Sequence, residues 1–290
     1  MKIYLILIAI CLQLNHVQAN VIKVLNFNTM CDFCKGSDFF DYSKRQKELR
    51  ELIQRHKPDL MSLQELRTRS QVKELLKDTD SYGIIATEGL LMSYADPAIV
   101  YNKNKFKLVS FKNYWLGPNH GHFSFGWRSA LPRQILIAEF IFQGTHFHFI
   151  SSHFDNLKTN LKGSIDALNK IASELKGPIL FAGDTNIPVN MKLYQKFSLQ
   201  WHDAFERKES FQVLGEYQSD LDICYLKKGK VFPTCRVEHF LIDKKYNWKV
   251  KNILLDAKRN SQNEFPSDHR AYVLDIIFPS DAPQSSLSDQ

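Results

Sequence analysis

Carboxylate, amide and imidazole side chains recur where segments that resemble buried strands end. Groups at the strand ends of an α/β sheet converge in a crevice, which is where ligands usually bind. Carboxylate and amide oxygens suit a hard cation such as Mg²⁺, and histidines beside them can supply acid and base. A turn cap would explain one such residue, but the repetition favours a metal-assisted site. The set is Asn28, Glu65, His153, Asp155, Asn156, Asp184, Asn186, Asp268 and His269.

A strand-rich α/β framework is needed to position these side chains. Helical spacing of apolar residues predicts helices over 44–56, 70–76 and 161–175, and the last is closed by Gly177 and Pro178. The almost wholly apolar run 134–142 predicts a strand buried on both faces. Strands are expected over 21–27, 59–64, 98–101, 106–111, 134–142, 146–152, 178–184, 222–226, 237–242, 249–255 and 271–278.

Two of these expectations concern strand neighbours and exposure. The strands over 98–101 and 106–111 are expected to form a hairpin around Asn102 and Asn104. Because His146 and His148 alternate with phenylalanines, both are expected on the exposed face of their strand.

Length and charge set the class of partner. The chain has 290 residues and a net charge of +7, with a pI near 9.0. No repeat or linker interrupts it, so we expect one large domain. A basic surface favours nucleic acid, phosphate esters or an acidic membrane face, although a modest positive charge can also serve solubility alone.

The first nineteen residues have the form of a secretory signal peptide. An early lysine precedes an apolar run that is short for a bilayer span, and small residues stand at the expected cleavage spacing. We therefore expect a signal peptide over 1–19, a domain over 20–279, a disordered tail over 280–290, and a secreted or periplasmic location. An uncleaved N-terminal anchor is the alternative.

Four cysteines remain after the signal segment is removed: Cys31, Cys34, Cys224 and Cys235. An even number in an exported protein indicates disulfides, with three connectivities open. Local pairing, Cys31 with Cys34 and Cys224 with Cys235, is the preferred expectation. The spacing of the second pair does not support a zinc site.

The motifs LNFNT, SLQE, SSHFDN, GDTN and SDHR occur in the order found in the endonuclease/exonuclease/phosphatase family, which the chain resembles over residues 21–278. The family includes deoxyribonuclease I-like nucleases, sphingomyelinases and phosphoinositide phosphatases. The resemblance implies an α/β (α+β) fold: a four-layer sandwich of two packed mixed β-sheets flanked by helices.

The resemblance also implies residue roles, which we carry over motif by motif. Glu65 resembles the principal metal ligand, with Asn28 beside it. Asp268 would be a further contact to metal or water. Asp184 would orient the attacking water, and Asn186 would hold a phosphate oxygen.

For proton transfer, the resemblance implies that His269 is the general base and that His153 contacts the phosphate or protonates the leaving oxygen. The family usually has an aspartate as the acid that orients the base, whereas this chain has Glu238 in CRVEHF. Asp222 is a second candidate for that role. Arg133 resembles a basic residue near the site, although it could equally be a surface charge.

Substrate contacts are expected from Arg133, Asp155 and Asn156. The aromatic loop over 113–127 could stack on bases, enter lipid or pack on the core.

The function expected from these features is divalent-metal-dependent hydrolysis of phosphodiesters, with Mg²⁺ or Mn²⁺ as cofactor. A secreted deoxyribonuclease I-like nuclease is the simplest form. The first alternative is a phospholipid-directed enzyme, a sphingomyelinase or phosphoinositide phosphatase, that acts at a membrane lipid surface. The second is a non-catalytic binding protein. We expect a monomer with no obligate protein partner.

Overall fold

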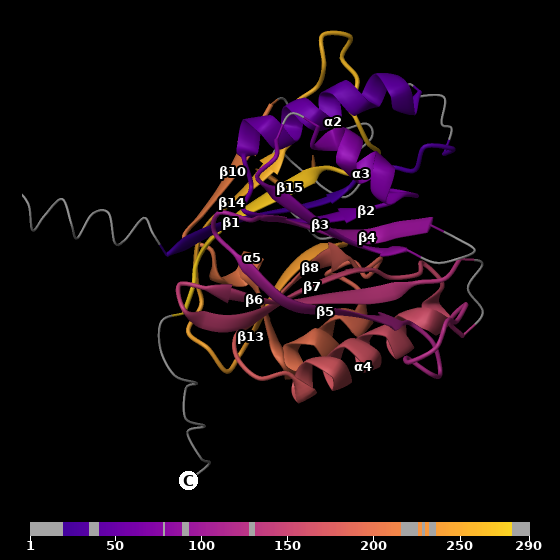
Figure 1. The fold of residues 1–290 in the computed structure, drawn as a ribbon, viewed down its shortest axis with the longest axis vertical. Helices are drawn as coiled ribbons and strands as arrows, with labels where there is room; N and C mark the ends of the chain where they lie inside the picture. The colour runs from indigo at the N-terminus through magenta and orange to yellow at the C-terminus, as the bar shows by residue number, and fades with distance from the viewer. Residues whose placement is uncertain are drawn as a thin grey trace, which may run out of the picture.

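Two β-sheets pack face to face, and helices cover both outer faces (Figure 1). The computed structural model describes residues 20–34, 41–77, 79–88, 93–127, 131–215, 226–227, 230–231 and 236–279. Helices α2 and α3 lie on one side of the sandwich and α4 on the other. This is the four-layer sandwich that the sequence predicts. The helices are α2 (Tyr42–His56), α3 (Arg69–Leu75), α4 (Lys158–Glu174), the 3-10 helix η1 (Lys192–Leu199) and α5 (Ala204–Arg207).

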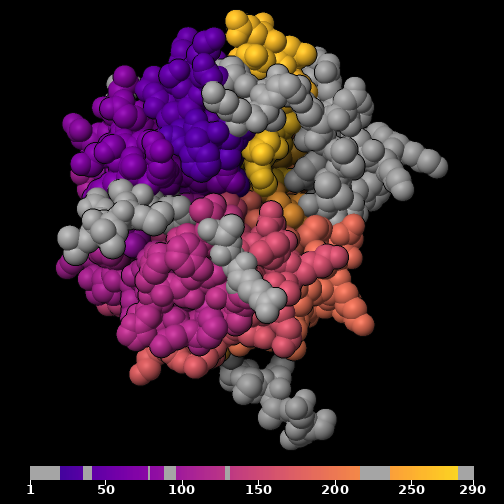
Figure 2. Space-filling model, turned by 90° about the vertical axis from the view of Figure 1, so that its right-hand side faces the viewer, coloured from indigo at the N-terminus to yellow at the C-terminus, as the bar shows by residue number. Residues whose placement is uncertain are grey.

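The first sheet is mixed, because β1 runs parallel to β2 and antiparallel to β15. It therefore joins the two ends of the domain, and in Figure 2 yellow C-terminal residues adjoin indigo N-terminal ones. Its order is β10 (Ser210–Leu214), β14 (Lys249–Asp256), β15 (Ala271–Ile277), β1 (Val21–Asn28), β2 (Leu60–Gln64), β4 (Ser93–Asn102) and β3 (Tyr82–Glu88).

The second sheet is also mixed, with β7 and β8 parallel and its other pairs antiparallel. A short separate pair is formed by β11 (Leu226–Lys227) and β12 (Lys230–Val231). The order of the second sheet is β5 (Lys107–Trp115), β6 (Gln134–Phe142), β7 (Thr145–His153), β8 (Ile179–Asp184), β13 (Glu238–Asp243) and β9 (Trp201–Asp203).

Three apolar clusters hold the layers together. The largest lies between the sheets, where Val24 of β1 and Phe140 of β6 are fully buried. A second joins the outer face of the first sheet to α2 and α3, and a third joins the second sheet to α4 and η1. Burial of most of its residues explains why the central strand β6 is almost wholly apolar. Among the helices of the described residues, none is long and apolar enough to cross a membrane.

The predicted hairpin between residues 98–101 and 106–111 is wrong. β4 pairs with β2 and β3 in the first sheet, whereas β5 pairs with β6 in the second. Between them the chain turns at Asn102, whose carbonyl accepts from the Phe106 N–H, and it then crosses to the other sheet. Phe106 is buried against Phe140, Phe142 and Phe147, so burial of this ring at the crossing outweighs local pairing.

The prediction for the alternating histidines is half wrong. His146 is exposed, but His148 retains only 9% of its accessible surface. His148 lies on the same face of β7 as Ile150, which packs in the cluster beneath α4. The helix layer thus covers a face that the alternation alone would leave open, and burial lowers the pKa of His148.

Of the expected disulfides, Cys31–Cys34 is present. Cys224, Cys235 and Asp222 lie outside the described residues, as do the predicted signal peptide, the tail over 280–290 and most of the strand expected over 222–226.

Candidate active site

Strand register brings three predicted site residues abreast in the second sheet. His153 pairs with Asp184 between the parallel strands β7 and β8, and Glu238 pairs with Asp184 between β13 and β8. All three residues are buried. Because β1 packs against β8 across the sandwich, Asn28 also reaches Asp184, and its Nδ2 donates to Oδ2 at 3.1 Å.

Asp184 is the centre of the site. Its Oδ2 lies 3.6 Å from Nε2 of His153 and 3.9 Å from Nε2 of His269. Burial acts to raise the pKa of Asp184, but the two histidines and the hydrogen bonds from Asn186 and Asn28 together hold it below its ordinary value. Asp184 is therefore ionised at neutral pH, between two imidazoles that come from different parts of the chain.

A carboxylate that sequence reasoning missed, Asp96, orients His153. Nδ1 of His153 lies 2.9 Å from Oδ2 of Asp96, and Arg133 donates to the same oxygen at 3.0 Å. Burial opposes ionisation of Asp96, but His153 and Arg133 outweigh it and lower its pKa. Arg133 is thus part of the site and not a separate surface charge. The feature of the sequence that could have indicated Asp96 is its position as an acid directly before a proline in the otherwise apolar run ADPAIV.

The second imidazole, His269, is oriented by Glu238. Nδ1 of His269 is hydrogen-bonded to Oε1 of Glu238. Of the two candidates for the acid that orients His269, Glu238 and Asp222, Glu238 is therefore the one seen in contact with it. Ser267 holds the SDHR loop to the end of β1, because its hydroxyl donates to the Asn28 carbonyl at 2.7 Å and accepts from the His269 N–H. Although burial disfavours the imidazolium, the Glu238 carboxylate outweighs it and raises the pKa of His269 to about 10.

Glu65 follows β2 in a left-handed backbone conformation, with φ of 64°. This conformation turns its side chain toward β1, where Nδ2 of Asn28 donates to Oε1 at 3.0 Å. The Cys31 N–H donates to Oε2 at 2.8 Å. The amide oxygen of Asn28 accepts from the Met30 N–H, so Asn28 presents its donor, and not its oxygen, to the two carboxylates Glu65 and Asp184.

Sequence reasoning also missed Arg45, a buried residue of α2. It donates to the carbonyls of Thr29, Met30 and Cys31 and to that of Pro266. It therefore ties the segment after β1 to the loop that carries Asp268 and His269. Nothing in the sequence around Arg45 distinguishes it from the charged residues on the outer face of α2.

The remaining predicted residues lie around this centre. Asn186, also left-handed at φ 52°, donates its N–H to Asp184 Oδ1 and its side-chain amide to the Phe154 carbonyl. Asp268 is exposed on the SDHR loop. Asp155 accepts from the Leu157 N–H and the Asn160 amide, so its carboxylate caps the start of α4. Asn156, next to it, is exposed, and substrate contact by either residue stays a prediction.

The donor groups fit a hard divalent cation. Asp184, Glu238 and His269 offer ligand atoms within 4.8 Å of one another, but Nδ1 of His269 is bonded to Glu238 and its Nε2 faces Asp184, so this imidazole is assigned to catalysis and not to the metal. Oε2 of Glu238 is buried without a hydrogen-bond partner among the residues that the structure describes, and Glu65 and Asp268 add carboxylates nearby. Cys31 and Cys34 adjoin Glu65 but are joined in a disulfide and offer no thiolate. Oxygen-rich sets of this kind suit Mg²⁺ or Mn²⁺.

The aromatic loop over 113–127 partly packs and partly reaches solvent. Leu116 is buried, and its N–H donates to the Arg133 carbonyl at 2.7 Å. Phe123 and Phe125 are about half exposed, at 53% and 49%, and their rings meet edge to face. The loop therefore presents aromatic rings to solvent from a backbone attached beside the site.

Comparison with known proteins places the chain in a class. The endonuclease/exonuclease/phosphatase family matches residues 26–269, and the chain belongs to it. Members of this family are phosphoester hydrolases and generally depend on divalent metals, so the protein is an enzyme that hydrolyses phosphate esters. No curated protein matches the sequence significantly.

Several solved structures share the fold. A family member from Bacteroides thetaiotaomicron is 22% identical, with a TM-score of 0.75 over 89% of this chain and 98% of that one. A mannosyl-6-phosphatase from the same organism is 20% identical, with a TM-score of 0.71 over 89% and 100%. TDP2 from D. rerio, in complex with a single-stranded DNA product, is 18% identical, with a TM-score of 0.65 over 89% and 99%.

Replacing Asp96 with asparagine is expected to lower turnover by about tenfold or more, because an amide can stabilise the wrong imidazole tautomer of His153. Steady-state kinetics on a phosphoester would measure the loss. Asp59→Asn is the matched control, since Asp59 is also buried and paired, with Lys105, at the opposite end of β2 from Glu65. Equal losses in the two variants would show that Asp96 acts only through stability.

The raised pKa of His269 predicts a pH-dependent stability in the presence of chelator. The folded state binds this proton more tightly than the unfolded chain, so the contribution is complete below the ordinary pKa of 6.5 and is lost as pH rises toward about 10. The free energy of unfolding of the wild type should therefore fall relative to His269→Gln across this window. Denaturant titrations at several pH values would measure it, and a constant difference would contradict the assignment.

Proposed function

We propose that the chain is a secreted phosphodiesterase that uses Mg²⁺ or Mn²⁺, and specifically a deoxyribonuclease I-like nuclease. The observation that carries the proposal is the pair of imidazoles, each backed by its own carboxylate, that face one oxygen of Asp184. Hydrolysis of a phosphodiester needs an activated water on one side of phosphorus and a proton for the leaving oxygen on the other. An ionised carboxylate and one oriented histidine can serve these two needs, and the second oriented histidine can hold the phosphate.

In this proposal Asp184 positions the attacking water and accepts its proton. The resemblance suggested His269 as the base, but its raised pKa favours an imidazolium at neutral pH. His269 therefore acts as a cationic donor to a phosphate oxygen, held by Glu238. His153, held by Asp96 and Arg133, gives a proton to the leaving oxygen.

The phosphate is held by further donors around this centre. Asn186 lies beside Asp184 and Arg133 beside His153, and in the proposal their side-chain N–H groups turn toward the phosphate oxygens from their present partners, the Phe154 carbonyl and Asp96. A divalent cation bound by Glu65 and Asp268, with Asn28 orienting the carboxylates, would neutralise charge on the phosphate. Preorganised donors and charges of this kind stabilise the transition state more than the ground state.

Nucleic acid is the proposed substrate because the chain carries a net charge of +7 and belongs to a family of phosphoester hydrolases. A phospholipid-directed enzyme is the second candidate, favoured by the exposed rings of Phe123 and Phe125 near the site, which could enter a lipid surface. We propose that the enzyme acts as a monomer without an obligate protein partner.

The test is a substrate panel with the purified protein lacking residues 1–19. Double-stranded DNA, RNA, sphingomyelin vesicles, phosphoinositides and a sugar phosphate are each supplied with Mg²⁺. DNA cleavage that is fast relative to the lipids supports the nuclease. Faster lipid hydrolysis, lost on Phe123→Ser with Phe125→Ser, would favour the phospholipid-directed enzyme over the nuclease.

Export is tested separately, by determining the N-terminus of the protein recovered from its native host. An N-terminus that retains residues 1–19 would contradict export.

A further inference from the structure

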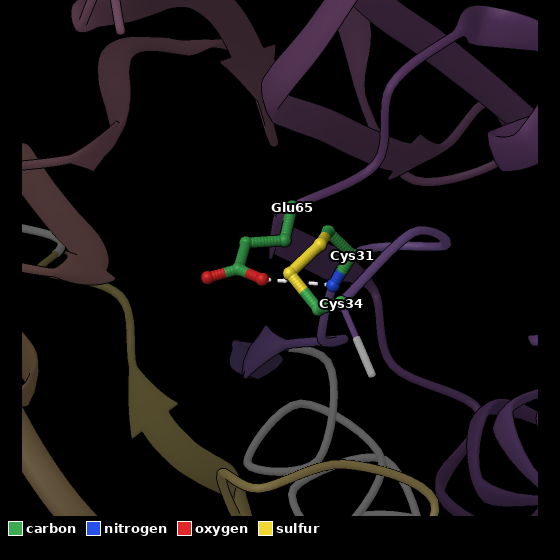
Figure 3. Close-up of side chains that lie close together, drawn as sticks. All are labelled: Cys31, Cys34 and Glu65. Atoms are coloured by element: carbon green, nitrogen blue, oxygen red, sulfur yellow. Dashed lines mark hydrogen bonds between the residues drawn. A yellow bond between two sulfur atoms is a disulfide. The ribbon is translucent and has the colours of Figure 1, made fainter. Parts of the chain in front are cut away.

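A disulfide lies against the carboxylate that is predicted to bind metal. Cys31 and Cys34 are joined, and Figure 3 shows their bridge beside the Glu65 side chain. The dashed line in the figure marks the hydrogen bond from the Cys31 N–H to Glu65 Oε2, at 2.8 Å. One half of the disulfide thus supplies a donor that orients this carboxylate.

Both carboxylate oxygens of Glu65 are held by the end of β1 and the segment that follows it. Oε1 accepts from Asn28 and Oε2 from Cys31, so both oxygens are held by residues within one short stretch. Met30, between them, has a left-handed backbone with φ of 58°. Left-handed conformations in residues other than glycine persist only where the surroundings enforce them. The geometry that presents Glu65 therefore needs restraint on both sides of Met30.

Arg45 and the disulfide supply that restraint from different directions. Arg45 holds the carbonyls of Thr29, Met30 and Cys31, whereas the disulfide closes the turn that follows Cys31. Opening the bridge leaves the Arg45 bonds in place, so the fold should survive. It frees Cys31 from Cys34, so the peptide that carries the Cys31 N–H is then restrained only by Arg45 at the Met30 and Cys31 carbonyls and is held less firmly against Glu65.

We propose that the Cys31–Cys34 disulfide is a positioning element for Glu65, so that reducing it weakens binding of the divalent cation. The inference rests on the proposed function for the assignment of Glu65 as a metal ligand. The enzyme would then be fully competent only in oxidising compartments, in keeping with export.

The bridge is open to chemical reduction from one end. Cys31 is buried, whereas Cys34 is exposed. A thiolate of a small dithiol attacks Sγ of Cys34, and Sγ of Cys31 leaves as a thiolate that takes up a proton. The second thiol of the reagent then attacks the mixed disulfide and releases Cys34. The protein disulfide gains two electrons and two protons, and the dithiol is oxidised to its cyclic disulfide.

The experiment measures Mg²⁺ affinity by titration calorimetry, without any substrate. The samples are the oxidised wild type, wild type reduced with dithiothreitol and desalted without oxygen, and Cys31→Ser with Cys34→Ser. Reduction should raise the Kd by about tenfold, the usual effect of losing a group that orients a metal ligand. The double variant should show the same Kd and no further response to reductant, and this separates the bridge from other cysteines.

Two comparisons make the outcome decisive. Melting temperatures in chelator show whether the reduced protein remains folded, so a lower affinity with an unchanged melting temperature supports positioning. Glu65→Gln tests the underlying assignment. If Glu65→Gln weakens Mg²⁺ binding but neither reduction nor the double variant does, the positioning role of the disulfide is refuted, whereas the assignment of Glu65 as a metal ligand stands. If Glu65→Gln leaves the Kd unchanged, the metal assignment of the proposed function fails with it.

Discussion

Replacing His269 with alanine is expected to slow phosphodiester hydrolysis by about a hundredfold to a thousandfold, the usual cost of losing a donor to charge that develops in the transition state. The variant loses the imidazolium that the Glu238 carboxylate holds at the site. Glu238→Gln should produce a milder loss, because a neutral partner still accepts a hydrogen bond but no longer favours the charged imidazole. Both effects should fall on kcat, measured by steady-state kinetics on the substrate that the panel identifies.

A matched control for the His269 and Glu238 variants is a second histidine–glutamate pair, away from the site. His146 and Glu139 form an exposed pair, with Nδ1 and Oε1 2.7 Å apart, at the far end of β7. His146→Ala and Glu139→Gln remove an imidazole and a carboxylate of the same kind and should leave turnover within about twofold, as is usual for surface substitutions. Near-normal turnover in His269→Ala would contradict the assignment of His269 to the catalytic site.

Asp184→Asn is expected to cause a loss at least as large, about ten-thousandfold, because it removes the carboxylate that both histidines face. Asparagine keeps the size of the side chain and, through its one acceptor oxygen, one of the two hydrogen bonds from Asn28 and Asn186, so the folded structure should persist. The double variant with His269→Ala should lose much less than the product of the two single losses, since members of one catalytic unit are not additive. Rates that multiply would show that the two residues act independently.

The individual strands and helices follow from the sequence because buried strands and amphipathic helices have distinct apolar periods, whereas the four-layer arrangement is what the resemblance to the family implies. The segment between Asn102 and Phe106 shows where this reasoning stops. Its local pattern suits a hairpin, and only the core between the two sheets, assembled from distant strands, determines that Phe106 crosses to the other side. His148 is a similar case, since its burial depends on the layer that α4 forms.

The site was predictable where a residue stands in a recognisable motif at the end of a strand. Asp184 and His269 are such residues, and the structure brings them together. Asp96 was not predicted as a site residue, because its partner His153 is 57 positions away and no local pattern links the two. For Asp155 the structure shows hydrogen bonds from the Leu157 N–H and the Asn160 amide at the start of α4, and its substrate contact stays a prediction.

The most direct test of the account is the metal dependence of hydrolysis by the purified protein without residues 1–19. Initial rates on double-stranded DNA, and on a simple chromogenic phosphodiester, are measured with Mg²⁺, with excess chelator, and after Mg²⁺ is restored, for the wild type and Asp184→Asn. The account predicts hydrolysis with Mg²⁺, loss of activity in chelator, recovery on restoration, and a near-inactive Asp184→Asn in every condition. A full rate in excess chelator, or an Asp184→Asn variant as active as the wild type, would contradict it.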